Sequence, residues 1–238
     1  MLLEVAGLKK NFGSITVADD LDLAIAPGEA VGIIGPNGAG KTTLFNLIAG
    51  ALLPTGGSIR FDGRDLTGRP PQGRCRAGIG RTHQIPQPFE KLTVFENLLV
   101  GAVYGRGRTE REAAQSCGEI LERLGLLTRA NTLAGALTLL ERKRLEMARA
   151  LATAPRLLLL DEIAGGLTEG ECAELVATIC EIRRTGVAIL WIEHVVHALL
   201  AVIDRLVVLN FGRKIAEGLP KDVMQLPEVY QIYIGIEA

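Results

Sequence analysis

Neither sign of charge is in excess in this sequence, whose 26 basic residues nearly balance its 27 acidic ones. Domains that bind nucleic acid usually carry a basic excess, so this balance gives no support to that class. The four cysteines include no C-x-x-C pair, the spacing that is typical of zinc and thiol–disulfide sites. We therefore expect cysteines that pack rather than bind metal, in a reducing, cytosolic setting.

An uninterrupted membrane-spanning run is also missing. The most apolar stretch, Val187 to Leu209, contains five ionisable residues, whereas a helix that crosses a bilayer needs about 20 consecutive, mainly apolar residues. The opening residues MLLEVAGLKK do not place basic residues before a long apolar core, so we expect no signal peptide. With 238 residues, a soluble chain of one large or two small domains is expected, docking at most onto a membrane partner.

What the sequence does contain is a glycine-rich loop between an apolar run and a helical one. Residues 35–43 read GPNGAGKTT and match the phosphate-binding pattern G-x-x-x-x-G-K-[ST] at every defined position. The run Ala30 to Ile34 is typical of a buried parallel strand, and Thr42 to Ala49 has apolar residues at helical spacing. The alternative is a glycine turn that binds nothing, but strand, loop and helix follow in the order that phosphate binding requires. The predicted nucleotide-binding residues of this loop are Gly35, Pro36, Asn37, Gly38, Ala39, Gly40, Lys41, Thr42 and Thr43.

The loop residues have separate tasks in phosphate binding. Glycines let backbone N–H groups approach phosphate oxygens closely, and the start of the helix adds a partial positive charge. Lys41 is expected to reach the β- and γ-phosphates of a nucleoside triphosphate and to act in catalysis, while the Thr42 hydroxyl holds Mg²⁺. The sequence therefore predicts a site for a nucleoside triphosphate with Mg²⁺.

Two carboxylates follow a second apolar run. Leu157 to Leu160 reads as a buried strand, and Asp161 and Glu162 come directly after it. In a phosphate-loop protein the first acid at such a strand end holds Mg²⁺, and the second can orient and deprotonate an attacking water. The pair therefore favours hydrolysis over phosphate transfer to a substrate, the alternative being an acidic strand end that leads into a turn.

Three further side chains are candidates because of their place in this pattern. His194 follows the next strand, 188–193, where it is expected to face the γ-phosphate and donate a hydrogen bond. Gln84 ends the apolar run that begins at Ile79 and is placed near Mg²⁺ or the attacking water. Phe12 lies among turn-forming residues and is expected to stack on adenine, unless it is an ordinary, partly buried phenylalanine. His83 and His197 have no such support and are assigned structural roles.

The remaining pattern indicates an α/β fold. Short apolar runs at 2–5, 15–18 and 21–25 predict strands of an antiparallel sheet, and the polar stretch 64–76 is expected to cover the surface. Residues 88–154 have helical spacing, with helices expected over 93–103 and 110–127 and a polar loop at 106–111 between them. This block interrupts an alternation of strands and helices that resumes with a strand at 156–163. The alternation includes a helix at 169–184, a strand at 187–193 and a strand at 205–210. Parallel strands with helical crossovers imply a doubly wound sheet with its ligands at the carboxyl ends of the strands.

Taken together, these residues closely resemble the ATP-binding subunits of ABC transporters. In the terms of that family, Phe12 is the adenine-stacking aromatic, GPNGAGKTT the Walker A loop and Gln84 the Q-loop. LLLLDE, ending at Glu162, matches Walker B with its catalytic glutamate, and His194 matches the switch histidine. The resemblance covers almost the whole chain. It implies the ABC ATPase fold: a single domain 1–238 with a RecA-like P-loop core and antiparallel β subdomain (1–87 and 155–218), an inserted α-helical subdomain (88–154) and a C-terminal segment (219–238).

A narrower resemblance is to the branched-chain amino acid importer group, supported most by the ending IAEGLPKDVMQLPEVYQIYIG. It implies a homodimer, or a heterodimer with a related subunit, that closes head to tail around two ATP molecules with Mg²⁺. It also implies a peripheral position at the cytoplasmic face of the cell membrane. There the dimer drives two membrane-embedded permease subunits, which an extracytoplasmic binding protein supplies with substrate. The segment from Gln84 to about Asn97 is expected to contact the coupling helix of the permease.

The chain departs from the family at the signature motif LSGGQ, which here reads LTLLE at residues 137–141. Thr138 keeps a hydroxyl for the partner's nucleotide, and Thr138-x-x-Glu141 forms a plausible capping box for a helix over 141–151. Both glycines are absent, so leucine side chains stand where the backbone would approach phosphate. Smaller departures are Ile163 after the glutamate and Thr168 in the D-loop.

Three functions are compatible with these patterns. The first is an ATPase that powers uptake of branched-chain or other hydrophobic amino acids, or related amides. The second is an ATPase of the lipopolysaccharide-export type, which is similar in sequence to this group. The third is a nucleotide-gated dimerisation switch with little hydrolysis, which the altered signature motivates. Relatives in DNA repair are disfavoured by the absence of a long coiled-coil insertion and of a basic excess, and relatives in translation by the single ATP-binding domain.

Overall fold

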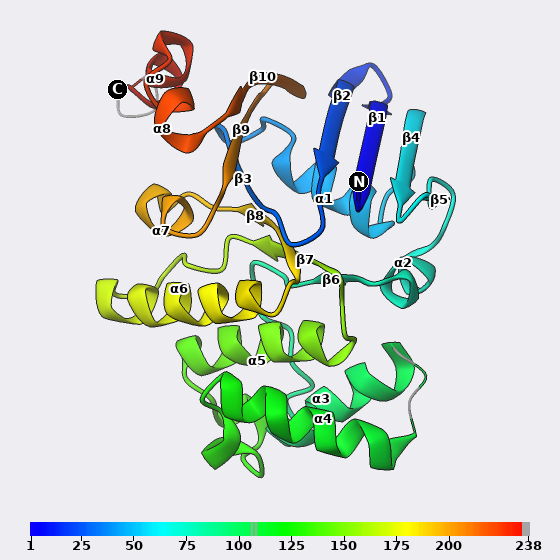
Figure 1. Cartoon of the computed structure of the whole chain (residues 1–238), viewed down its shortest axis with the longest axis vertical. Helices are drawn as coiled ribbons and strands as arrows, with labels where there is room; N and C mark the ends of the chain where they lie inside the picture. Colours follow the sequence, from blue (N-terminus) through cyan, green and yellow to red (C-terminus); the bar gives the residue numbers. More distant parts are fainter. Residues whose placement is uncertain (106, 108, 235–238) are drawn as a thin grey trace.

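The computed structural model describes residues 1–105, 107 and 109–234. A six-stranded sheet forms the centre of the protein (Figure 1). The five strands from β9 to β6 run parallel, and β10 pairs antiparallel at the edge. In spatial order the strands are β10 (Arg213–Gly218), β9 (Arg205–Asn210), β3 (Ala30–Ile34), β8 (Ala188–Ile192), β7 (Leu157–Asp161) and β6 (Ile79–Arg81). Every residue of β3, β7 and β8 is buried, as expected for parallel strands covered on both faces.

The two faces of this sheet belong to two apolar cores. Alternate residues of β8 point to opposite sides, so Trp191 lies in one core and Leu190 in the other. On the Trp191 side the sheet packs against α6 (Glu169–Arg184) and α7 (Val196–Leu200), and on the Leu190 side against α1 (Lys41–Ala49). The doubly wound arrangement predicted from the sequence is therefore confirmed.

A second, four-stranded antiparallel sheet packs over α1, beside the phosphate loop (Figure 1). Its order is β2 (Ile15–Ile25), β1 (Leu3–Phe12), β4 (Gly56–Phe61) and β5 (Arg64–Asp65). The expected antiparallel subdomain is thus confirmed. Two details differ from expectation: the runs at 15–18 and 21–25 form one continuous strand, and Phe12 is the last residue of β1, paired with Ile15, rather than a turn residue.

The helical block lies at the far end of the molecule from the second sheet (Figure 1). Its elements are α3 (Val94–Val100), η1 (Gly101–Gly105), α4 (Glu110–Arg123), η2 (Leu127–Arg129), η3 (Ala134–Ala136) and α5 (Leu139–Ala152). The predicted helix over 93–103 ends instead in the π-helical turn η1, and α5 begins at Leu139 because Thr138 is its N-cap. Thr138 accepts from Glu141 N–H and the Glu141 side chain accepts in return, so the predicted capping box is confirmed.

The stretch 64–76, which its polar composition assigned to the surface, contains a buried arginine. Arg74 of α2 (Pro71–Ala77) is completely buried, and its guanidinium donates to the Leu47, Ile48, Thr67 and Arg69 carbonyls. Two of these carbonyls, Leu47 and Ile48, belong to the last turn of α1, where the regular helical hydrogen bonds end; Leu47 O also accepts from Gly50 N–H. Burial lowers the pKa of Arg74. The four carbonyls accept from guanidinium N–H groups that would bind water if the side chain were at the surface.

The chain continues from β10 into α8 (Pro220–Val223) and α9 (Pro227–Ile234). Residues 235–238 of the expected C-terminal segment, and positions 106 and 108 of the expected polar loop before α4, lie outside the described residues. The domain boundaries stay predictions. None of the described helices is long and apolar enough to span a bilayer.

Candidate nucleotide site

The glycine-rich loop runs from β3 into α1 and surrounds a hollow of about 210 Å³. Gly40, the N-cap of α1, has φ of 97°, and a Cβ at this position would lie 2.6 Å from the Val17 carbonyl oxygen. Only glycine fits both the left-handed backbone and this close approach. The lining residues are Val17, Asn37, Gly38, Ala39, Gly40, Lys41, Thr42, Thr43 and Glu162.

The Lys41 side chain lies against the first residues of the glycine-rich loop. Its Nζ donates to the Gly35 carbonyl at 2.6 Å and to the Pro36 carbonyl at 3.0 Å, and the side chain is buried. Burial lowers the pKa of Lys41, while the nearby Glu162 and Asp161 carboxylates oppose that shift. The ammonium thus lies against the start of the loop, within electrostatic reach of the two carboxylates, and its role in phosphate binding stays a prediction.

Glu162 brings together three residues that lie far apart in the sequence. Its Oε1 lies 2.8 Å from His194 Nε2, and its Oε2 accepts from Gln84 Nε2 at 2.5 Å. Glu162 itself has φ of 46°, an unusual value for a residue other than glycine. A carboxylate is therefore oriented at the phosphate hollow by an imidazole and an amide from the two neighbouring strand ends.

Asp161, the last residue of β7, forms a contact that the sequence pattern did not reveal. Its Oδ2 lies 3.0 Å from Arg81 NH2, and Arg81 also donates to Asn46 Oδ1 at 2.6 Å. Arg81 ends β6, the strand next to β7, so both side chains emerge at the same edge of the sheet, but their contact depends on a strand register that the sequence alone does not supply. The arginine offsets the charge of Asp161 and ties it to α1.

The residues assigned to Mg²⁺ have the right donor atoms. Thr42 supplies a hydroxyl, Asp161 a carboxylate, and Gln84 a carbonyl oxygen, since its Nε2 is engaged by Glu162. Mg²⁺ usually takes one or two carboxylates together with substrate phosphates rather than a protein cage. The described part of the chain holds no cluster of three or more His, Cys, Asp and Glu residues suited to a metal.

Phe12 and Thr138 do not line the phosphate hollow in the described structure. Phe12 stands at the tip of the β1–β2 hairpin, 47% exposed, with Lys10 Nζ 5.0 Å from its ring centre. Thr138 is the N-cap of α5. The next residue, Leu139, is 45% exposed, and a Cβ added at Gly166 would lie 3.5 Å from its Cδ2. Phe12 and Thr138 are thus both exposed, and their nucleotide-binding roles stay predictions.

The comparisons with known proteins agree with this geometry. A family model described as ABC transporter matches residues 18–165, more than half of the chain. The chain belongs to the ABC transporter family. It is an ATP-binding subunit of that family, and such subunits are ATPases coupled to transport. The family suggested by the sequence is thereby confirmed.

Curated relatives match nearly the whole chain. The chain is 38% identical to the high-affinity branched-chain amino acid transport ATP-binding protein BraF of Pseudomonas aeruginosa, and 39% identical to LivG, of the same description, from Escherichia coli K12. Each match covers 98% of this chain and 98% of the relative. The lipopolysaccharide export system ATP-binding protein LptB of Haemophilus influenzae is 34% identical over 98% of this chain and 97% of its own length.

A solved structure has the same fold. A nucleotide-free ATP-binding cassette from an ABC transporter superposes with a TM-score of 0.90 at 34% identity, covering 98% of this chain and 99% of that one. The expected ABC ATPase fold is therefore confirmed.

Proposed function

We propose that this protein is the ATP-hydrolysing subunit of an importer for branched-chain or other hydrophobic amino acids, or related amides. Similarity to BraF and LivG over 98% of the chain supports the cargo. The observation that carries hydrolysis is the Glu162 carboxylate, held at the phosphate hollow by His194 and Gln84. A turn that merely ends a strand would not orient both carboxylate oxygens.

Each residue of the site has a role in this proposal. Lys41 and the loop N–H groups bind the β- and γ-phosphates, and Glu162 takes a proton from the water that attacks the γ-phosphate in line. His194 donates a hydrogen bond to the γ-phosphate and fixes Glu162. Thr42, Asp161 and Gln84 would hold Mg²⁺, which would supply positive charge to offset the negative charge of the phosphates.

Phe12 is proposed to stack on adenine. Phe12→Ala should raise the Kd for ATP by about tenfold, because stacking of a base on an aromatic ring contributes roughly 1–3 kcal/mol, and should leave kcat at saturating ATP unchanged. Titration with a fluorescent ATP analogue measures the Kd. Ile15→Ala, at the same exposed hairpin tip, is the control, and equal affinities in both variants would reduce Phe12 to an ordinary surface aromatic.

The nucleotide is proposed to be closed by a second ATP-binding chain, either another copy or a related subunit. The α5 N-terminus presents the Thr138 hydroxyl and the positive end of a helix dipole to the partner's γ-phosphate. Thr138→Ala should cost about 1 kcal/mol of stability through the lost cap and should also weaken ATP-dependent dimerisation.

Thr109→Ala is the matched control for this variant, because Thr109 forms the same capping box at α4. Both variants should melt at lower temperature, but only the Thr138 variant should shift the dimerisation curve obtained by light scattering. Equal dimerisation of both variants would restrict Thr138 to capping.

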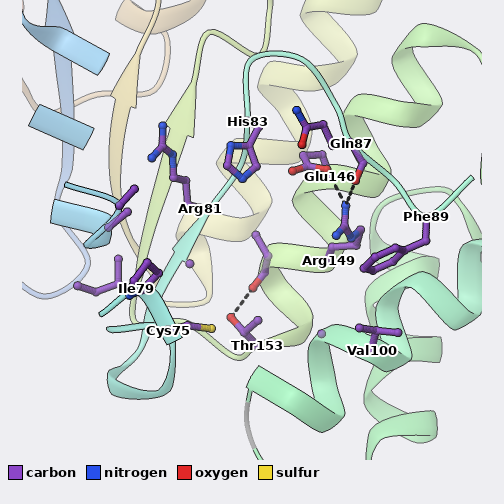
Figure 2. A pocket seen from close by; sticks show the side chains of 16 residues that line it. Cys75, Ile79, Arg81, His83, Gln87, Phe89, Val100, Glu146, Arg149 and Thr153 are labelled. Atoms are coloured by element: carbon purple, nitrogen blue, oxygen red, sulfur yellow. Dashed lines mark hydrogen bonds and ion pairs between the residues drawn. The ribbon is translucent and has the colours of Figure 1, made fainter. Parts of the chain in front are cut away.

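The membrane subunit is proposed to dock where the core meets the helical block. A cavity of about 390 Å³ opens there, lined by α2, β6, α3, α5 and the segment after Gln84. Figure 2 shows Arg149 in this cavity, where it contacts Glu146, the Gln87 carbonyl and the Phe89 ring. A permease coupling helix seated here would hold this chain at the cytoplasmic face of the membrane and connect it, through the permease, to an extracytoplasmic binding protein.

Transport measurements test the proposed cargo. The chain is expected to copurify with two membrane subunits and, in proteoliposomes that contain them and their binding protein, to drive ATP-dependent accumulation of labelled leucine. Copurification with lipopolysaccharide-export membrane subunits would instead favour the alternative suggested by LptB. Absence of Mg²⁺-dependent turnover would favour a nucleotide-gated switch.

A further inference from the structure

A buried carboxylate stands behind the candidate catalytic pair. Glu193 directly follows β8, and only 1% of it is exposed. Its Oε2 accepts from Ala164 N–H at 2.9 Å, and its Oε1 accepts from the N–H groups of His194 and Val195 at 2.9 and 3.3 Å. Both carboxylate oxygens are thus used by backbone groups from two separate loops.

The two loops are those that carry Glu162 and His194. Ala164 lies two residues after Glu162, in the loop that follows β7, and His194 begins the loop that follows β8. The 2.8 Å contact between Glu162 Oε1 and His194 Nε2 depends on the relative position of these loops. Glu193 is the side chain that hydrogen-bonds to both of their backbones.

Two titratable side chains on neighbouring helices are influenced by Glu193. Lys143 of α5 is 4% exposed; burial lowers its pKa, and the Glu193 carboxylate opposes that shift. For Cys172 of α6, burial and, after it, the charge of Glu193 raise the pKa of the thiol. The buried Glu193 carboxylate itself is satisfied by the three backbone N–H groups.

We propose that Glu193 is a positioning residue for ATP hydrolysis, which holds the Glu162 and His194 loops in register through its three backbone hydrogen bonds. The proposal rests on the roles proposed above for Glu162 and His194.

A carboxylate is required because two of its oxygens accept hydrogen bonds from opposite sides. An amide in its place has only one acceptor, so Glu193→Gln must lose the bond to Ala164 or the bonds to His194 and Val195. Glu193→Gln is therefore expected to lower kcat at least about tenfold, because small misplacements of reacting groups have effects of this size or larger. The Kd for ATP should stay within about twofold, since Glu193 does not line the phosphate hollow.

The matched control is Asp204→Asn. Asp204 is also a carboxylate that accepts from a backbone N–H group distant in sequence. Its Oδ2 accepts from Ala30 N–H at 3.0 Å, at the amino end of β3 and not at the carboxyl ends of the strands. Asp204→Asn should lower the melting temperature and leave kcat unchanged. If kcat instead falls in both variants in proportion to the loss of melting temperature, the proposal is overturned. Glu193→Asp keeps both oxygens and should retain more turnover than Glu193→Gln. If the Gln variant does not fold, the Asp variant is compared with the control in its place.

A second readout does not depend on turnover. The sequence has three histidines, so imidazole nitrogens labelled with ¹⁵N can be assigned with one variant, His194→Gln. In Glu193→Gln the His194 signal should shift, and those of His83 and His197 should not. An unchanged His194 signal in Glu193→Gln would overturn the proposal. If that signal shifts but the separate Glu162→Gln variant hydrolyses ATP normally, only the roles assigned to the catalytic pair are overturned.

Discussion

Glu162→Gln is expected to slow steady-state ATP hydrolysis at least about a hundredfold, the lower end of the effect of a lost general base. Glutamine keeps the size of the side chain and can still contact His194 and Gln84, but it cannot accept the proton of the attacking water. The Kd for ATP should therefore be little changed. Release of phosphate by the two purified proteins, at saturating Mg-ATP, measures the difference.

Glu181→Gln, an exposed position on α6, is the control for this change of charge and should hydrolyse ATP at the wild-type rate. Turnover of the Glu162 variant within a few fold of wild type would remove Glu162 from the role of general base.

Lys41→Met is expected to lower kcat/KM for ATP about a hundredfold or more, the effect of removing a preorganised donor from a developing negative charge. Methionine fills a similar volume but offers no charge to the β- and γ-phosphates. The loss should appear in the Kd as well as in kcat, which distinguishes this variant from Glu162→Gln. Isothermal titration with ATP, together with phosphate release, separates the two contributions.

Lys221→Met, which removes a lysine from α8 far from the phosphate loop in sequence, should leave both quantities unchanged. Binding of ATP by the Lys41 variant with wild-type affinity would show that the loop N–H groups alone determine affinity.

Local patterns were sufficient for the parts of the fold that depend on local physics. The apolar run at 30–34 could only be a buried strand, and the predicted bounds of α6 and β9 are those of the structure. The Thr138 capping box was readable because its two members are three residues apart. The site could be predicted to the extent that parallel strands place their carboxyl ends together, which is why Gln84, Glu162 and His194 meet.

Contacts between side chains that are distant in sequence could not be read in this way. The ion pair of Arg81 with Asp161 depends on the register of β6 against β7. The burial of Arg74 depends on its reaching the carbonyls at the end of α1. Glu193 looked like the polar end of a strand, and its hydrogen bond from Ala164 N–H exists only because the loop after β7 folds back onto it.

The proposed function requires that ATP be held between two ATP-binding chains in spite of the altered signature motif. The direct measurement is size-exclusion chromatography with light scattering on the Glu162→Gln protein, alone and with any related ATP-binding chain that copurifies with it, in Mg-ATP and in Mg-ADP. We predict a dimer in ATP and monomers in ADP, because the LTLLE end of α5 would close on the partner's γ-phosphate. A protein that binds ATP and yet remains monomeric in both mixtures would contradict the account.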